Sequence, residues 1–220
     1  NAELPVCKKR QVEIFTEPEI VRLAHHIVDE PDLTGLGILL ALNSGLRLGE
    51  LCALRWSDID WRQRALHIRR NVVKLSGQPI LVKEPKTRAG VRVVYLSKEL
   101  CKLLRVWQKE SAWEKKQRGE GGLEEEDYLF RQPGGDSRVP GTFTFRFKKI
   151  LQEGDLPDNL NVHSLRHTNA SMLIAQGVDV RTVAGLLGHA QPSTTLDIYS
   201  HAFDKNKKLA QEKLAEAMGL

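Results

Sequence analysis

The sequence predicts a mainly α-helical fold of the α+β class with one small three-stranded antiparallel β-sheet. Apolar residues recur at helical spacing along most of the 220 residues, whereas the apolar period falls to two between Arg64 and Leu96. Hydrophobic residues make up 41% of the chain, which is enough to bury a core in one domain with or without tails. The chain contains no internal repeat.

The first half of the chain supplies three helices and then the strands. Thr16 is a natural N-cap for the helix in "FTEPEIVRLAHHI", and the nearly all-apolar "GLGILLALNSG" predicts a central helix that ends at Gly45. A short helix, "LRLGELCALRW", follows at once. Three strands are predicted in "ALHIRRNVV", "QPILVKE" and "GVRVVYL", with turns at Ser76-Gly77 and Arg88-Ala89-Gly90.

The second half of the chain returns to helical periodicity. A helix in "SKELCKLLRVWQKE" leads into a charged stretch, residues 109–127, which we expect to be a solvated helix end and loop. Further helices are predicted in "PGTFTFRFKKILQEG", "HSLRHTNASMLIAQG", "VDVRTVAGLLG" and "STTLDIYSHAF", and a charged tail helix ends the chain.

Charge and cysteine content narrow the class of protein. Thirty-three Lys and Arg against 28 Asp and Glu give a net charge of +5, which permits a nucleic-acid partner without requiring one. Cys7, Cys52 and Cys101 lie far apart and form neither a disulfide framework nor a metal-ligand pattern. No apolar run reaches the length of a membrane span and no signal peptide opens the chain. We therefore expect a cytoplasmic protein with no membrane partner.

The chain divides into three parts. Residues 1–11 lack periodicity and an initiator Met, so we expect an interdomain linker and a chain that is a fragment. Residues 12–203 form the main domain. Residues 204–220 form a charged tail helix with a thin apolar stripe at Ala210, Leu214, Ala217 and Met218.

The segment "HSLRH" places cations where a helix disfavours them. His163, Arg166 and His167 lie in the first turns of a predicted helix, whose N-terminus already carries about half a positive charge. His163 and His167 have the i, i+4 spacing of two zinc ligands. However, Arg166 would repel a metal ion, and neither the metalloprotease Glu nor a Cys or Asp cluster accompanies them. We expect no metal and no cofactor.

A phosphate anion accounts for this cationic set. Arg47 and Arg166 can each grip two phosphate oxygens, and His163 and His189 add donors that titrate near neutral pH. The positive N-terminus of the helix adds its field to theirs, so a bound phosphodiester would compensate the cations. Taken singly, each of these residues has an ordinary structural explanation as a surface cation or a helix cap.

Two further residues complete the chemistry. Tyr199 is the one plausible nucleophile nearby, and we expect the positive surroundings to activate its phenol, although it could equally be a core residue. Lys86, on a tip between two strands, can protonate a leaving sugar oxygen, although such a lysine is usually just solvated.

Five motifs together resemble a known family. "SGLRLGEL", "PKTRAGVRVVYL", "HSLRHT", "LLGH" and "TTLDIYSH" occur in the order found in the catalytic domain of the tyrosine recombinases, the phage and conjugative-transposon integrase family. One motif alone is a weak signal, but five in order over residues 12–203 are specific. Asn169, where an aromatic or His is frequent, and Pro192, in the expected loop before the tyrosine helix, depart from the pattern. Family members usually carry further DNA-binding domains before this one, so residues 1–11 would be the linker from a missing N-terminal DNA-binding region.

The resemblance implies a role for each residue. Arg47 and Arg166 would clamp the scissile phosphate, His189 would donate to one of its oxygens, and Glu50 would support the site. The proton-transfer and nucleophile roles fall to Lys86 as general acid, His163 as assisting acid/base and Tyr199, which would form a 3′-phosphotyrosine.

The implied function is that of a site-specific DNA recombinase that integrates or excises a mobile element. The alternatives are a type IB topoisomerase-like enzyme that relaxes DNA and a catalytically inactive DNA-binding regulator. Implied partners are double-stranded DNA and further copies of the chain in a tetramer on DNA, with room for accessory directionality or DNA-bending proteins. The tail would dock on a neighbouring protomer, or on its own domain, in the cytoplasm of a bacterial cell or phage-infected host.

Overall fold

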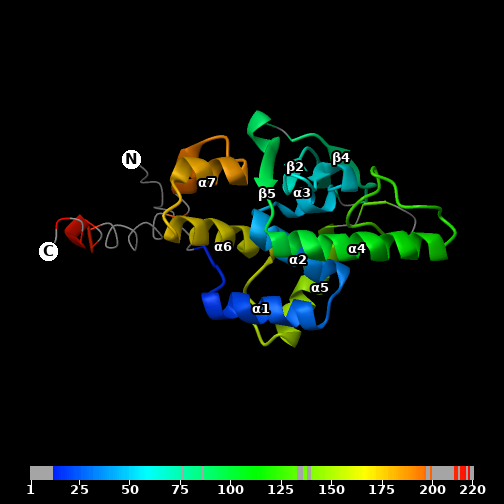
Figure 1. Ribbon diagram of the computed structural model, residues 1–220, viewed down its shortest axis with the longest axis horizontal. Coiled ribbons are helices and arrows are strands. Elements are labelled where there is room, and N and C mark those ends of the chain that lie inside the picture. The colour runs from blue at the N-terminus through cyan, green and yellow to red at the C-terminus, as the bar shows by residue number, and fades with distance from the viewer. Residues whose placement is uncertain are drawn as a thin grey trace, which may run out of the picture.

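The fold consists of helices arranged around one central helix, with two small sheets on one side (Figure 1). The computed structural model describes residues 12–220 except 76, 86, 133–135, 138–139, 197–198, 200–210, 213, 217 and 219–220. The expected linker, residues 1–11, and the candidate general acid Lys86 therefore lie outside the described residues. The helices are α1 (Glu17–Asp29), α2 (Leu33–Ser44), α3 (Leu48–Cys52), α4 (Lys98–Gln117), α5 (Pro140–Glu153), α6 (Val162–Ala175) and α7 (Val180–Leu187).

Helix α2 lies at the centre because it is apolar on every side. It contacts α1, α3, α4, α5 and α6, and most of its residues are buried. Asp32 caps its first turn by accepting a hydrogen bond from the Gly35 amide at 2.6 Å. Gly45 ends it with a left-handed backbone, φ 64°, as predicted from the sequence. Its C-terminus consequently faces α6, where the candidate site forms.

The strands pair differently from the single sheet expected. A three-stranded antiparallel sheet has the order β1 (Ile59–Asp60), β2 (Ala65–Ile68), β5 (Arg92–Tyr95), and a two-stranded sheet joins β3 (Asn71–Val73) to β4 (Leu81–Lys83). The predicted strand "ALHIRRNVV" is thus divided between two sheets. It breaks at Arg69 and Arg70, and the Arg70 side chain binds the buried Asp58 at 2.6 Å. The mainly α fold with a small antiparallel sheet is confirmed, whereas the membership of the sheet is corrected.

Strand β5 presents alternate residues to the core. Val94 and Leu96 are buried, whereas Val93 and Tyr95 are exposed. Because Arg92 lies on the same face as Val94, its side chain points inward and only 6% of it is exposed. Helix α7 contacts this strand, so the buried arginine lies between the sheet and the C-terminal helices.

Helices α6 and α7 enclose a second, smaller core. Its buried members are Ala170, Ile174, Val183, Leu187 and Tyr199. Residues 192–196 are helical, so Pro192 begins a helix instead of lying in a loop, a position that proline tolerates. In the described part of the tail, residues 211–212 and 214–216 are helical. Within the described ranges, no helix is both long enough and apolar enough to cross a membrane.

Candidate active site

The ends of several elements bring the predicted site residues together. Arg47 directly precedes α3, and its guanidinium donates to the carbonyl of Gly188, just after α7, at 3.4 Å. His163 and Arg166 lie in the first turns of α6, and His189 follows Gly188. The positive charges of Arg47 and Arg166 act on both His163 and His189. Residues from opposite ends of the domain therefore share one electrostatic environment.

Arg166 is held by the C-terminal ends of two helices. Its guanidinium donates to the carbonyl of Gly45 at 2.7 Å and to that of Leu187 at 2.6 Å, and only 1% of the residue is exposed. These carbonyls are the negative ends of the α2 and α7 dipoles. The fold itself therefore already compensates part of the positive charge of Arg166, a role that we expected a bound anion to fill. Burial, with Arg47 and Arg92, still lowers the pKa of Arg166 to about 9, which leaves it protonated at neutral pH.

A buried carboxylate holds Arg47. Glu50 accepts from the Arg47 side chain at 2.8 Å and from its backbone amide at 2.9 Å. Glu50 also accepts hydrogen bonds from both terminal nitrogens of the Arg92 guanidinium, at 2.8 and 3.1 Å. Burial acts to raise the pKa of Glu50, but its hydrogen bonds and charge contacts with Arg92 and Arg47 hold that pKa below its ordinary value. Glu50 is consequently an ionised support between two arginines.

The N-terminus of α6 is not open to a ligand in the way that we expected. The side chain of Asn161 accepts hydrogen bonds from the His163 amide at 2.9 Å and from the Ser164 amide at 3.2 Å. In turn, the Ser164 hydroxyl accepts a hydrogen bond from the backbone amide of Asn161 at 3.2 Å. The field of the helix remains, but these amides already have partners within the chain.

The histidines of the site resist protonation. Burial and the charges of Arg166 and Arg47, joined by Arg92 and His163, lower the pKa of His189 to about 4. Desolvation and the same two arginines lower the pKa of His163. His189 Nδ1 is also hydrogen-bonded to the hydroxyl of Thr195 at 2.8 Å. The cluster carries more positive than negative charge, which is the environment that an anion would relieve.

Tyr199 is buried and bonded to a histidine. Its hydroxyl lies 2.7 Å from Nδ1 of His167, and none of the residue is exposed. Burial raises the pKa of the Tyr199 phenol to about 12, although the charge of Arg166 acts to lower it. The expectation of a phenol activated by its positive surroundings is therefore wrong for this arrangement, because burial outweighs the nearby charge.

Two residues contact the site without a predicted role in its chemistry. Arg92 lies on a predicted strand without a predicted role. The alternation alone does not show that Arg92 and Val94 lie on the buried face, because the residues on the other face are also apolar. The sequence places His167 among the cations of the helix start and at metal-ligand spacing from His163, but it does not predict the contact with Tyr199. Its ring meets that of His163 edge to face, with centroids 4.5 Å apart, and its Nδ1 is engaged by Tyr199. Among the described residues, no group of three or more His, Cys, Asp or Glu could hold a metal ion.

A cavity of about 300 Å³ opens beside Arg47. It lies between α3, strands β3 and β4 and the turn after β4. Its polar lining includes Arg47, Glu50, Asn71, Lys83 and Thr87. A ligand in this cavity would meet the exposed part of Arg47, of which 39% is accessible. The cationic cluster is thus open to solvent on the side of the β3–β4 hairpin.

The fold and this arginine–histidine–tyrosine cluster are those that the resemblance to the tyrosine recombinases implies. Residues 13–206 match the model of the phage integrase family, and the chain belongs to that family. It is 31% identical over 214 residues to a tyrosine recombinase XerC-like protein of Caldanaerobacter subterraneus subsp. tengcongensis, covering 93% of this chain and 54% of that protein. It is 30% identical over 217 residues to the ICEBs1 integrase of Bacillus subtilis strain 168, covering 98% of this chain and 57% of the integrase. The chain spans about half the length of these curated relatives.

Solved structures share the fold at lower identity. The Tn1549 transposon integrase in complex with transposon right end DNA has a TM-score of 0.76 and 22% identity, covering 94% of this chain and 67% of that one. The XerA recombinase has a TM-score of 0.69 and 24% identity, covering 92% of this chain and 66% of that one. Both agree with the predicted fold class.

Proposed function

We propose that this chain is the catalytic domain of a site-specific recombinase that cuts and rejoins DNA strands for a mobile element. The observation that carries the proposal is the convergence of Arg47, Arg166, His163 and His189 next to Tyr199, with one buried carboxylate among the arginines. An excess of positive charge suits a phosphodiester whose negative charge grows in the transition state. Relatives that are named integrases support the mobile-element assignment, and a neighbour solved with transposon DNA supports DNA as the substrate.

The chemistry follows from the roles of the side chains. The phenol oxygen of Tyr199 attacks the scissile phosphorus, a phosphorus–oxygen bond forms, and the bond to the 5′ oxygen breaks. The phenolic proton passes to His163 as base, and Lys86 protonates the leaving 5′ oxygen. Arg47 and Arg166 offset the charge on the phosphoryl oxygens. Attack by a 5′ hydroxyl of another strand reverses the step and exchanges the strands.

Cleavage requires Tyr199 to leave its position in the free protein. A fully buried phenol whose hydroxyl is engaged by His167 cannot reach a phosphate in solvent. DNA binding therefore has to draw the nucleophile out of the small core between α6 and α7. The protonated phenol is inert until then, which protects DNA from unproductive cleavage.

A suicide substrate tests the nucleophile. A duplex nicked near the cleavage point traps the covalent intermediate, which a denaturing gel separates from free protein. Tyr199→Phe should bind DNA and form no adduct, whereas Tyr95→Phe, on the exposed face of β5, should form it at the wild-type rate. An adduct formed by the Tyr199→Phe variant would refute the assignment.

The DNA products distinguish a recombinase from an enzyme that only relaxes supercoiled DNA. Two labelled duplexes that carry the target site should exchange strands when the protein is added. Relaxation of supercoiled DNA without any exchange would contradict a recombinase and favour a topoisomerase.

Assembly on DNA gives the tail a role. In its described part, 53% of Leu214 and 60% of Met218 are exposed, so their apolar side chains are largely uncovered in one chain. We propose that the tail of one protomer docks on a neighbour within a tetramer on DNA, and that residues 12–203 form the catalytic unit. The remaining partners, accessory directionality or DNA-bending proteins, stay a prediction, as does the cytoplasm as the place of action.

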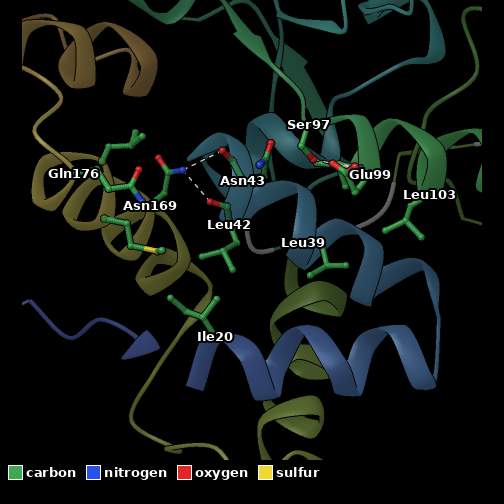
Figure 2. Close-up of a pocket in the computed structure, with 12 residues that line it drawn as sticks. Ile20, Leu39, Leu42, Asn43, Ser97, Glu99, Leu103, Asn169 and Gln176 are labelled. Atoms are coloured by element: carbon green, nitrogen blue, oxygen red, sulfur yellow. Dashed lines mark hydrogen bonds between the residues drawn. The ribbon is translucent and has the colours of Figure 1, made fainter. Parts of the chain in front are cut away.

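We propose a groove on the helical face as the place where such a tail docks. It is a cavity of about 400 Å³ between α1, α2, α4 and α6, and Figure 2 shows the apolar side chains of Ile20, Leu39 and Leu42 at it. At one end Asn169 donates to the carbonyls of Leu42 and Asn43, at 2.9 and 3.0 Å (Figure 2). The apolar stripe of the tail helix would pack on the apolar side chains of this groove.

Truncation after Phe203 tests this docking. The shortened chain should still bind a single site, because the proposed phosphate contacts remain. It should form fewer complexes on a paired-site substrate and exchange strands more slowly, as native gels and product gels would show. Wild-type assembly and exchange by the shortened chain would contradict a role between protomers.

A further inference from the structure

Arg92 makes an unusual set of contacts for an arginine on a β-strand. Its side chain is 6% exposed and donates to both carboxylate oxygens of Glu50, at 2.8 and 3.1 Å. Its Nε donates to the carbonyl of Leu186 at 2.6 Å, and Nη1 lies 3.2 Å from the carbonyl of Gly90. One guanidinium thus joins α3, the end of α7 and the turn before β5.

These contacts lead directly to the phosphate-binding residues. Glu50 holds both the backbone and the side chain of Arg47. Leu186 precedes Leu187, whose carbonyl binds Arg166, and Gly188, whose carbonyl binds Arg47. One shared carboxylate therefore links Arg92 to Arg47, and two consecutive residues at the end of α7 link it to Arg166.

The packing leaves little freedom for this arrangement. A Cβ added to Gly188 would come within 2.9 Å of Nη1 of Arg92 and of the carbonyl oxygen of Ala89. The left-handed backbone of Gly188, φ 67°, then directs the chain towards His189. The end of α7 therefore packs directly against the guanidinium of Arg92.

We propose that Arg92 is a positioning residue of the phosphate site, acting through Glu50 on Arg47 and through the end of α7 on Arg166 and His189. The inference rests on the proposed function and extends it to a residue that does not itself touch the reacting phosphate. A planar fork is needed because two bonds run to one carboxylate while a third runs to a carbonyl. A lysine would supply the positive charge, but not three hydrogen-bond donors held in these directions.

Single-turnover cleavage measures the effect. Misplacement of catalytic groups by about 1 Å costs about 10²-fold in rate, and we expect that loss for Arg92→Gln at saturating DNA, with DNA affinity little changed. Arg92→Lys should recover only part of the rate. Arg131→Gln is the matched control, because Arg131 is 7% exposed and pairs with Glu120 away from the cluster. Thermal unfolding of each variant shows how much of any loss is due to unfolded protein.

A double variant separates positioning from general stability. Because one route from Arg92 runs through Glu50, Arg92→Gln should slow cleavage less in a Glu50→Gln chain than in the wild-type chain. The loss that remains is the part transmitted through the end of α7, so the two losses should be less than additive. Additive losses, full activity of Arg92→Lys, or an equal loss for Arg131→Gln would overturn the proposal. A wild-type chain that forms no covalent adduct would overturn the proposed function instead, so the two failures are distinguishable.

Discussion

Binding of a phosphodiester should raise the pKa of His189 back to its ordinary value. In the free protein its pKa is lowered to about 4 by burial and by Arg166, Arg47, Arg92 and His163. One negative charge about 4 Å from the ring contributes about 4 kcal/mol at an effective dielectric constant of 20, which corresponds to roughly three pKa units. A bound phosphate is therefore sufficient to offset the lowering and restore a pKa near the usual 6.5.

The sign of the pH dependence follows from the direction of this change. Because the complex binds a proton more tightly than the free protein, DNA binding should take up a proton between the free and bound pKa values. Affinity should rise as pH falls from about 6.5 towards 4, until the free histidine is also protonated. Proton NMR titration of the His189 ring, with His189→Gln to assign its signal, measures both pKa values.

Binding measured at several pH values supplies the functional readout. His189→Gln should lose the part of the pH dependence that belongs to this residue, while other histidines keep theirs. An unchanged His189 pKa in the DNA complex, or a His189→Gln chain with the full wild-type pH dependence, would show that no anion enters this cluster.

Three further expectations follow from the same geometry. Arg166→Lys should lower the free energy of unfolding by about 1–3 kcal/mol, because an ammonium cannot serve the carbonyls of both Gly45 and Leu187 as the fork does; urea unfolding measures it, and wild-type stability would contradict it. Gly188→Ala should slow cleavage, since its Cβ would lie 2.9 Å from the Ala89 carbonyl oxygen on a left-handed backbone; an unimpaired cleavage rate would argue against a fitted α7 end. Cleavage should persist in excess EDTA, and a loss that a divalent ion restores would favour a metal-assisted mechanism.

Local signals were sufficient for most elements of the fold. Thr16 occupies the N-cap position of α1, where its amide donates to Glu19, and Gly45 ends α2, both as predicted, because helix starts and stops depend on residues within one or two turns. The change to period two placed strands between Arg64 and Leu96. It did not reveal which strands pair, since β2 pairs with β5 and not with the next strand along the chain.

The sequence by itself determined the helical class and the order of five motifs that place the chain in its family. Only the tertiary structure decided what the cations of the site bind. Arg166 meets the ends of α2 and α7, 121 and 21 residues away; Arg92 meets Glu50, 42 residues away; and Tyr199 meets His167, 32 residues away. Periodicity and capping report neighbours a few residues apart, whereas the burial that raises the pKa of one phenol and the carbonyls that hold one guanidinium come from distant segments. Their positions depend on the path of the whole chain.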